Sequence, residues 1–261
     1  MRGNPQQGPG AAGGIGTDPQ ATRGRPRSGR APMIKLEGLG VRHRDGPLLE
    51  AASLTINAGE AVALLGLSGS GKSLLLEVIA GNLPPAAGRV VLGSTGQEPP
   101  RVGYAGALPA AWPVIRCDEF LELVARPRGL AGQPLREAIR RGLDFAGCGH
   151  RRDERIDRLP DGRRKQLLIA SAMLHDPEIL LLDNPFALLD APGRQDVSRA
   201  IADFTLAGGV VLATADGGGI ENCFGRAILL EAGGLIDTSA QGAADWPEWS
   251  RALLADWHRR R

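Results

Sequence analysis

The stretch Gly66-Leu67-Ser68-Gly69-Ser70-Gly71-Lys72-Ser73 decides the fold of this chain. An apolar run at residues 61–65 precedes it, and a leucine-rich helical pattern begins at Leu74. A glycine, four residues and then Gly-Lys-Ser between a strand and a helix is the pattern of a phosphate-binding loop. Glycines let backbone N–H groups turn toward phosphate oxygens, and the helix N-terminus adds partial positive charge. The competing interpretation, a plain Gly/Ser-rich turn, does not account for the Lys-Ser pair at this offset.

Three side chains are predicted to act on the phosphates and on a metal ion. Lys72 is expected to reach the β- and γ-phosphates, and the Ser73 hydroxyl is expected to bind Mg²⁺. Asp183 ends the apolar run Ile179–Leu182, which has the pattern of a buried parallel strand. An aspartate at such a strand end supplies the carboxylate that Mg²⁺ prefers. The alternative role, capping the next turn, is less favoured in a chain that carries a phosphate-binding loop.

Composition limits the class of protein. The 261 residues allow one large domain or two small ones, and 43% hydrophobic residues fit a soluble globular chain. A formal net charge of +2 gives no argument for a nucleic-acid partner. No apolar run reaches membrane-spanning length, and no secretory signal is visible. Three scattered cysteines fit neither a zinc site nor a disulfide framework, so a reducing cytoplasm is the expected compartment.

The order of predicted elements indicates an α/β fold with a parallel sheet. Residues 1–32 are rich in Gly, Pro and Arg and are expected to be a disordered tail, while 243–261 are expected to form a C-terminal helix. Between them, a helical block at about residues 112–176 interrupts a strand-rich pattern and is predicted to be an inserted subdomain. Strands are predicted at 34–36, 52–56, 61–65, 89–92, 102–105, 179–182, 209–214 and 226–230. Ligands of such a sheet bind at the carboxyl ends of its strands, where the loop and Asp183 both fall.

From residue 33 to 242 the chain resembles the ATP-binding-cassette (ABC) ATPases, the nucleotide-binding subunits of ABC transporters. Besides the loop and Asp183, the segment Leu159-Pro160-Asp161-Gly162-Arg163 lies where that family has its Leu-Ser-Gly-Gly-Gln signature. Ala187–Asp190 is similar to the family's dimer-contact loop, and His43 stands where an aromatic residue stacks on adenine. Within the family, the helical block and the Gly-Arg-Arg run look most like ATPases of ABC-2-type exporters.

The resemblance implies a P-loop NTPase core with N-terminal antiparallel strands, and ATP and Mg²⁺ as cofactors. It also implies a separate membrane-spanning permease, a second ABC subunit that is identical or different, and a cytoplasmic position peripheral to the membrane. The nucleotide-binding residues are then predicted to be Gly66, Leu67, Ser68, Gly69, Ser70, Gly71, Lys72, Ser73 and His43, with Ser73 and Asp183 as metal ligands.

Several positions depart from the family pattern. Asn184 stands where the resemblance places a catalytic Glu, and Ala215 stands where it places a His that contacts the γ-phosphate. Ala107 aligns with a Gln that senses Mg²⁺ and couples to the membrane subunit. Asn cannot take a proton from attacking water, and loss of a general base costs typically 10²–10⁴ in rate. No catalytic position of the family is therefore predicted to be intact.

The signature segment departs as well. Pro160 replaces the Ser and lacks an N–H group, and Asp161 replaces a Gly and places negative charge near a phosphate of the opposing subunit. Arg163 and Arg164 are expected to offset part of that charge.

These observations predict an ABC subunit that binds Mg-ATP to drive or gate a separate permease and hydrolyses ATP weakly. Asp190 or Asp216 could still substitute as the base. The alternative function is a nucleotide-binding regulatory or scaffold protein without transport. A P-loop kinase or GTPase fits poorly, because the helical block and the signature-like segment have no role there.

Overall fold

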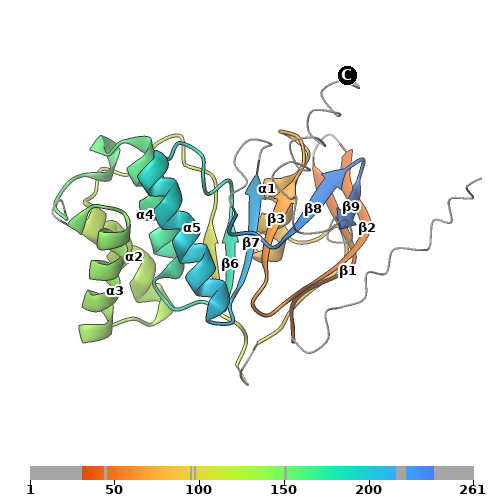
Figure 1. Ribbon diagram of the computed structural model, residues 1–261, viewed down its shortest axis with the longest axis horizontal. Helices are drawn as coiled ribbons and strands as arrows, with labels where there is room; N and C mark the ends of the chain where they lie inside the picture. Colours follow the sequence, from red (N-terminus) through yellow and green to blue (C-terminus); the bar gives the residue numbers. More distant parts are fainter. Residues whose placement is uncertain are drawn as a thin grey trace, which may run out of the picture.

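The computed structural model shows an α/β molecule with two sheets and a helical subdomain (Figure 1). The predicted C-terminal helix, most of the predicted N-terminal tail and Asp216 lie outside the residues that the structure describes. The structure describes residues 31–43, 46–94, 96, 98–149, 152–215 and 222–237. Among them, no helix is long and apolar enough to cross a membrane.

The larger sheet has six strands in the order β5-β6-β7-β3-β8-β9. Its five parallel strands are β5 (Val102–Ala105), β6 (Ile179–Leu182), β7 (Val210–Ala215), β3 (Ala61–Leu65) and β8 (Arg226–Glu231). Every residue of β3, β6 and β7 is buried, because elements cover both faces of the sheet. This double coverage explains why these strands are continuous apolar runs and do not alternate.

A second, antiparallel sheet packs against the helix that follows the loop at residues 66–73. Its order is β2-β1-β4, formed by β1 (Pro32–His43), β2 (Gly46–Asn57) and β4 (Ala87–Leu92). Side chains of β1 and β2 share one apolar core with helix α1 (Lys72–Ile79) and one face of the parallel sheet. This core fixes the helix that follows the loop against both sheets.

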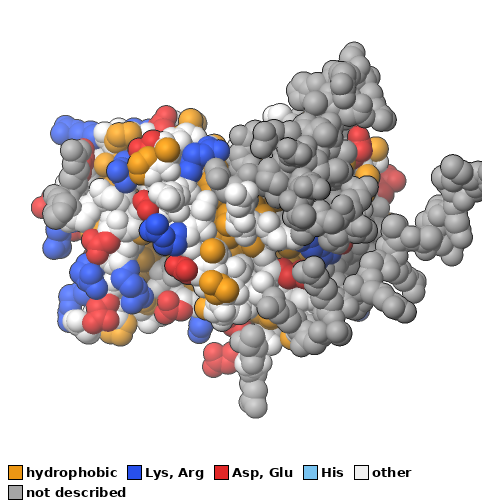
Figure 2. All heavy atoms as spheres, in the orientation of Figure 1, with side chains coloured by type: hydrophobic (Ala, Val, Ile, Leu, Met, Phe, Trp, Pro, Cys, Tyr) orange, Lys and Arg blue, Asp and Glu red, His pale blue; other side chains and the backbone are white. Residues whose placement is uncertain are grey.

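The other face of the parallel sheet is covered by α4 (Asp161–Met173) and α5 (Ala191–Leu206). The helical subdomain adds α2 (Cys117–Ala125) and α3 (Gly132–Phe145), which pack with α4 around their own apolar core. Two 3₁₀ turns, η1 (Arg126–Arg128) and η3 (Ile156–Arg158), complete it. Over this subdomain, basic and acidic side chains are interspersed on the face drawn in Figure 2.

The structure confirms the predicted fold class and corrects it in detail. Strand β9 (Gly234–Asp237) was not predicted; it pairs antiparallel with β8 across a tight turn that contains Ala232 and Gly233, both at positive φ. Apolar spacing predicts a helix over residues 134–148, but α3 ends at Phe145, because Gly147 adopts a φ of 64°. The sequence also predicts a helix over residues 163–174, and the corresponding α4 begins at Asp161.

Candidate nucleotide-binding site

The loop after β3 can be built only with glycine at its bends. Gly66, Gly69 and Gly71 have φ values of 152°, 80° and 97°. A Cβ atom on Gly66 would lie 2.7 Å from the Leu230 carbonyl oxygen, and one on Gly71 would lie 2.8 Å from a methyl carbon of Leu48. Backbone conformation and close packing therefore both require the glycines that the motif supplies.

Two side chains of the loop are directed into it. The Lys72 ammonium is 5% exposed and donates to the carbonyl oxygens of Gly66 (3.0 Å) and Leu67 (2.6 Å). The Ser70 Oγ atom is buried without a hydrogen-bond partner among the described residues. Buried polar groups are nearly always paired, so this hydroxyl marks a place for a ligand atom. An ammonium and an orphaned hydroxyl in a glycine-rich bend suit a phosphate oxygen.

The predicted metal ligands lie in contact although 110 residues separate them in the sequence. The Ser73 hydroxyl donates to Asp183 Oδ1 over 3.0 Å. The Thr214 hydroxyl donates to the same oxygen over 2.5 Å and is buried. A carboxylate beside hydroxyl oxygens, close to a phosphate-binding loop, fits Mg²⁺. Thr214 was missed from the sequence, and its signal is a lone hydroxyl near the carboxyl end of an apolar strand.

Strand register and one hydrogen bond place Ala215 and Asn184 at this same edge. Ala215 pairs with Leu65, the last residue before the loop, and is 5% exposed. The Asn184 backbone N–H donates to Thr214 Oγ1 over 2.8 Å, and Asn184 adopts a φ of 47°. The structure thus brings Asn184 and Ala215 beside Asp183, whereas Ala107 lies exposed in the loop that follows β5.

His43 is the exposed last residue of β1 and pairs with Gly46 across the hairpin. The same hairpin carries Leu48, whose side chain packs against Gly71 of the loop. The hairpin that bears His43 therefore lies against the loop at residues 66–73.

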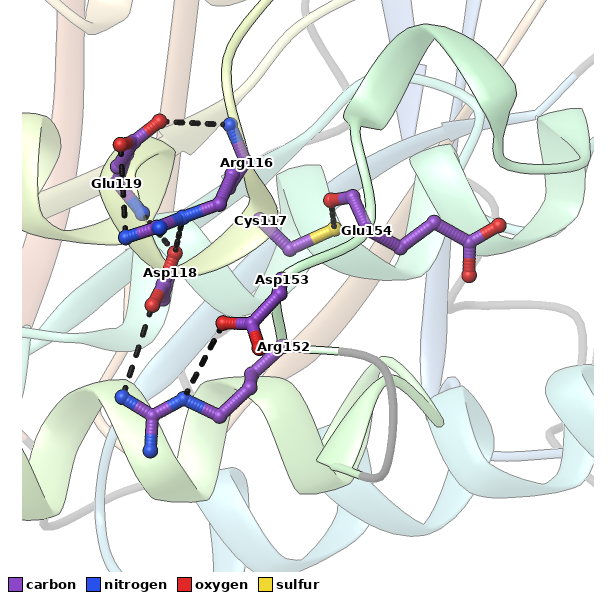
Figure 3. A network of polar contacts seen from close by, with 7 residues as sticks. All are labelled: Arg116, Cys117, Asp118, Glu119, Arg152, Asp153 and Glu154. Atoms are coloured by element: carbon purple, nitrogen blue, oxygen red, sulfur yellow. Dashed lines mark hydrogen bonds and ion pairs between the residues drawn. The ribbon is translucent and has the colours of Figure 1, made fainter.

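A polar network ties the segment before the signature to the start of α2 (Figure 3). The Glu154 carbonyl oxygen accepts both the backbone N–H and the thiol of Cys117, each over 3.1 Å. The Asp118 carboxylate lies 3.1 Å from the Arg116 guanidinium and 3.6 Å from that of Arg152. The chain entering the signature is thereby held against the helical subdomain.

Signature residues occupy the N-terminus of α4. Pro160 is the N-cap residue and makes no side-chain capping bond. Arg164 pairs with Asp161 over 3.0 Å and also donates to the carbonyl oxygen of Asp157 over 2.7 Å. The Asp161 carboxylate therefore has a cationic partner within its own helix. The Arg163 guanidinium donates to Gln166 Oε1 over 3.0 Å. That Arg163 offsets part of the Asp161 charge stays a prediction.

The dimer-contact-like loop packs against that helix start. A Cβ atom on Gly162 would lie 2.8 Å from the Leu188 carbonyl oxygen, so the two segments touch through the glycine. The Leu188 side chain is 62% exposed. Asp190 caps α5, because its Oδ1 accepts the Gly193 N–H over 2.9 Å. This structural bond disfavours Asp190 as a substitute base.

Lys165 is a further polar residue of the site that sequence reasoning missed. It lies on α4, is 2% exposed, and donates to the carbonyl oxygens of Asp183 (2.5 Å) and Gly106 (3.4 Å). Burial lowers the pKa of its ammonium to about 8, against the opposing effect of the Asp183 charge. The available signal was a lysine at helical spacing from Ile169 and Ala172, which both face the sheet.

Comparisons with known proteins agree with this geometry. The family description "ABC transporter" matches residues 49–187, more than half of the chain. The chain is 34% identical to the uncharacterized ABC transporter ATP-binding protein YxlF of Bacillus subtilis, over 63% of this chain and 56% of that protein. It is 33% identical to the zinc import ATP-binding protein ZnuC of Saccharophagus degradans, over 66% and 65%. The matches thus span less than two thirds of either relative.

A third relative, the aliphatic sulfonates import ATP-binding protein SsuB 2 of Paracoccus denitrificans, is 35% identical over 68% of each chain. Among solved structures, a dimeric ATP-binding cassette with bound ADP and Pi has the same fold, with a TM-score of 0.71 at 23% identity, over 80% of this chain and 100% of that one. Sequence and fold lead to one conclusion: the chain belongs to the ABC transporter family.

Proposed function

We propose that this chain is the ATP-binding subunit of an ABC transporter, that it binds Mg-ATP through residues 66–73, and that it drives or gates a separate membrane-spanning permease. The observation that carries the proposal is the contact between Ser73 and Asp183 at the mouth of the loop. Ser73 and Asp183 would hold Mg²⁺ through these two oxygen atoms, and the bound ion would neutralise phosphate charge. The phosphates would then compete with the Gly66 and Leu67 carbonyl groups for the Lys72 ammonium.

We further propose that hydrolysis is weak. Asn184 and Ala215 lie at the site edge. The Asn184 amide cannot take a proton from water, and the Ala215 methyl group cannot donate a hydrogen bond to a γ-phosphate. At the signature end, Pro160 offers no N–H and Asp161 brings a carboxylate. Nucleotide binding and release would therefore change the conformation of the assembly without fast turnover.

The partners follow from the same proposal. A permease would hold the chain at the cytoplasmic side of a membrane, and a second ABC subunit, identical or different, would complete each nucleotide site. The relatives' names specify zinc import, aliphatic sulfonate import and Nod factor export for those proteins. None of these cargoes is transferred to this chain.

Nucleotide binding to the purified full chain tests the core of the proposal. A fluorescent ATP analogue with Mg²⁺ should bind the unmodified protein, and Lys72→Ala should abolish binding. Lys35→Ala is the matched control, because Lys35 is half-exposed and forms a surface ion pair with Glu37. Equal binding by the two variants would refute the assignment of the loop.

Co-purification in detergent separates transport from the alternative, a regulatory or scaffold protein. The tagged full chain, extracted from its native membranes, should carry a membrane-spanning protein with it. Capture of a second ABC subunit alone, with no membrane-spanning partner, would favour the regulatory function and contradict the transport proposal.

A further inference from the structure

A buried ammonium group lies directly behind the candidate metal site. Lys165 is almost fully buried on α4, and its Nζ atom donates to the main-chain carbonyl oxygens of Asp183 and Gly106. Burial of a charged group is costly unless hydrogen bonds compensate for the lost water. A lysine at this helix position therefore needs an explanation beyond packing, because an apolar side chain would fill the same space at a lower cost in free energy.

The two carbonyl groups belong to the segments that matter for the nucleotide. Asp183 provides the candidate metal ligand and directly precedes Asn184, while Gly106 directly precedes Ala107, the residue at the family's Gln position. The Asp183 carboxylate is itself held by Ser73 and Thr214. Hydroxyl groups thus fix the side chain of Asp183 while the Lys165 ammonium fixes its main chain.

Helix α4 gives this ammonium a rigid base. A Cβ atom on Gly103 of β5 would lie only 2.2 Å from the Ala172 carbonyl oxygen, so the helix and the strand are in direct backbone contact. Ile169 and Ala172 pack in the same core as β6 and β7. At its other end, α4 begins with the signature residues. A displacement of the signature end would therefore be transmitted along α4 to the Asp183 carbonyl.

We propose that Lys165 is a positioning residue of the metal site: its ammonium holds the Asp183 main chain, sets the carboxylate for Mg²⁺ and links that carboxylate to the signature helix. The inference rests on the proposed function, because it presupposes a metal–nucleotide complex at residues 66–73. Groups that orient a metal ligand from behind typically change metal affinity 10–100-fold when they are removed. A purely structural crosslink between α4 and the sheet would change stability and leave metal affinity alone.

The test is a Mg²⁺ titration of the full chain with a fluorescent ATP analogue, compared with binding of the same analogue in EDTA. Lys165→Met should raise the Mg²⁺ concentration for half-saturation by about 10–100-fold. Binding in EDTA should stay within about twofold, because the phosphate-binding loop is untouched. Lys165→Gln, which keeps a hydrogen-bond donor but loses the ammonium charge, should shift the Mg²⁺ requirement in the same direction and serves if the Met variant does not fold.

Arg226→Met is the matched control, since it removes a largely buried cation that donates to the Thr55 carbonyl oxygen (2.8 Å) at the amino end of β8, opposite the site. It should lower thermal stability and leave the Mg²⁺ requirement unchanged. A Lys165 variant that loses stability but keeps the unmodified Mg²⁺ requirement would overturn the inference and leave the proposed function standing. Failure of the unmodified chain to bind the analogue with Mg²⁺ would overturn both.

Discussion

At the scale of single residues, the candidate site is a set of oxygen atoms gathered around one carboxylate. Asp183 Oδ1 accepts two hydroxyl groups, and one of these, from Thr214, also accepts the Asn184 N–H. Asn184 adopts a left-handed backbone conformation, which asparagine tolerates better than most residues. The position adjacent to the candidate metal site therefore accommodates asparagine in its observed backbone conformation, and the asparagine amide cannot serve as a general base.

The sequence predicted Ser73 and Asp183 because each sits in a local pattern, a loop motif and a strand end. It did not reveal Thr214 or Lys165, because their roles depend on how strands and a helix far apart in the chain align. The pairing of Asp161 with Arg164 was predictable from helical spacing, since the two are three residues apart. The bond from Arg163 to Gln166 has the same spacing within α4. The bond from Arg163 to the Ala146 carbonyl oxygen (3.4 Å) depends instead on where α3 ends, which no local pattern shows.

His175 provides a prediction about acid stability. Burial, and then the nearby positive charge of Arg128, lower its pKa; Arg101 acts in the same direction, while the Val102 backbone and Asp176 oppose it. Its Nδ1 atom is buried without a partner among the described residues. As the pH falls below about 6.5, the unfolded chain takes up a proton before the folded chain does, so stability should fall.

Between about pH 7 and about pH 5.5, we expect the free energy of unfolding to fall less in His175→Asn than in the unmodified chain. Urea denaturation at the two pH values measures both falls. Arg128→Ala should act in the same direction, because it removes a repulsive charge from the imidazolium. An unchanged pH dependence in His175→Asn would show that other groups govern acid stability.

At the scale of elements, the contact between α4 and β5 connects the helical subdomain to the edge of the sheet that carries the candidate nucleotide site. Gly103 makes that contact, and its backbone does not need a glycine conformation. A Cβ atom there would instead lie 2.2 Å from the Ala172 carbonyl oxygen and 3.1 Å from a methyl carbon of Leu180. We predict that Gly103→Ala lowers the free energy of unfolding by about 1–3 kcal/mol through overpacking. Thermal or urea unfolding of the purified variant and of the unmodified chain measures this loss of stability.

Gly225→Ala is the control for that prediction. A Cβ atom on Gly225 meets no atom within 4 Å, so this variant should unfold within about 0.5 kcal/mol of the unmodified protein. Equal stability of the two variants would mean that α4 and β5 separate easily, which would contradict the rigid link assumed for Lys165.

Elements differ in how visible they are in the sequence. Strands β3, β6 and β7 were predictable because full burial on both faces produces unbroken apolar runs. Strand β9 was not, because it is four residues long, half-exposed and shaped by the turn at Ala232 and Gly233. Its place at the sheet edge comes from pairing with β8, a long-range contact that no local pattern shows.

At the scale of the whole molecule, we propose that the parts that hold a triphosphate are assembled while the positions that the family resemblance associates with hydrolysis are altered. Two of these positions, Asn184 and Ala215, lie at the same carboxyl edge of the sheet as the loop at residues 66–73. We infer that the molecule retains the nucleotide-dependent conformational part of the family's cycle and has lost most of the chemical part.

Steady-state ATP turnover by the purified chain, at saturating Mg-ATP, tests this central claim most directly. Phosphate release should equal the background of Lys72→Ala although the unmodified protein binds ATP. Asn184→Glu should restore little, because Ala215 and Asp161 remain. Brisk turnover that Lys72→Ala abolishes would contradict the account: another residue would then supply the base, and the chain would be an ordinary transport ATPase.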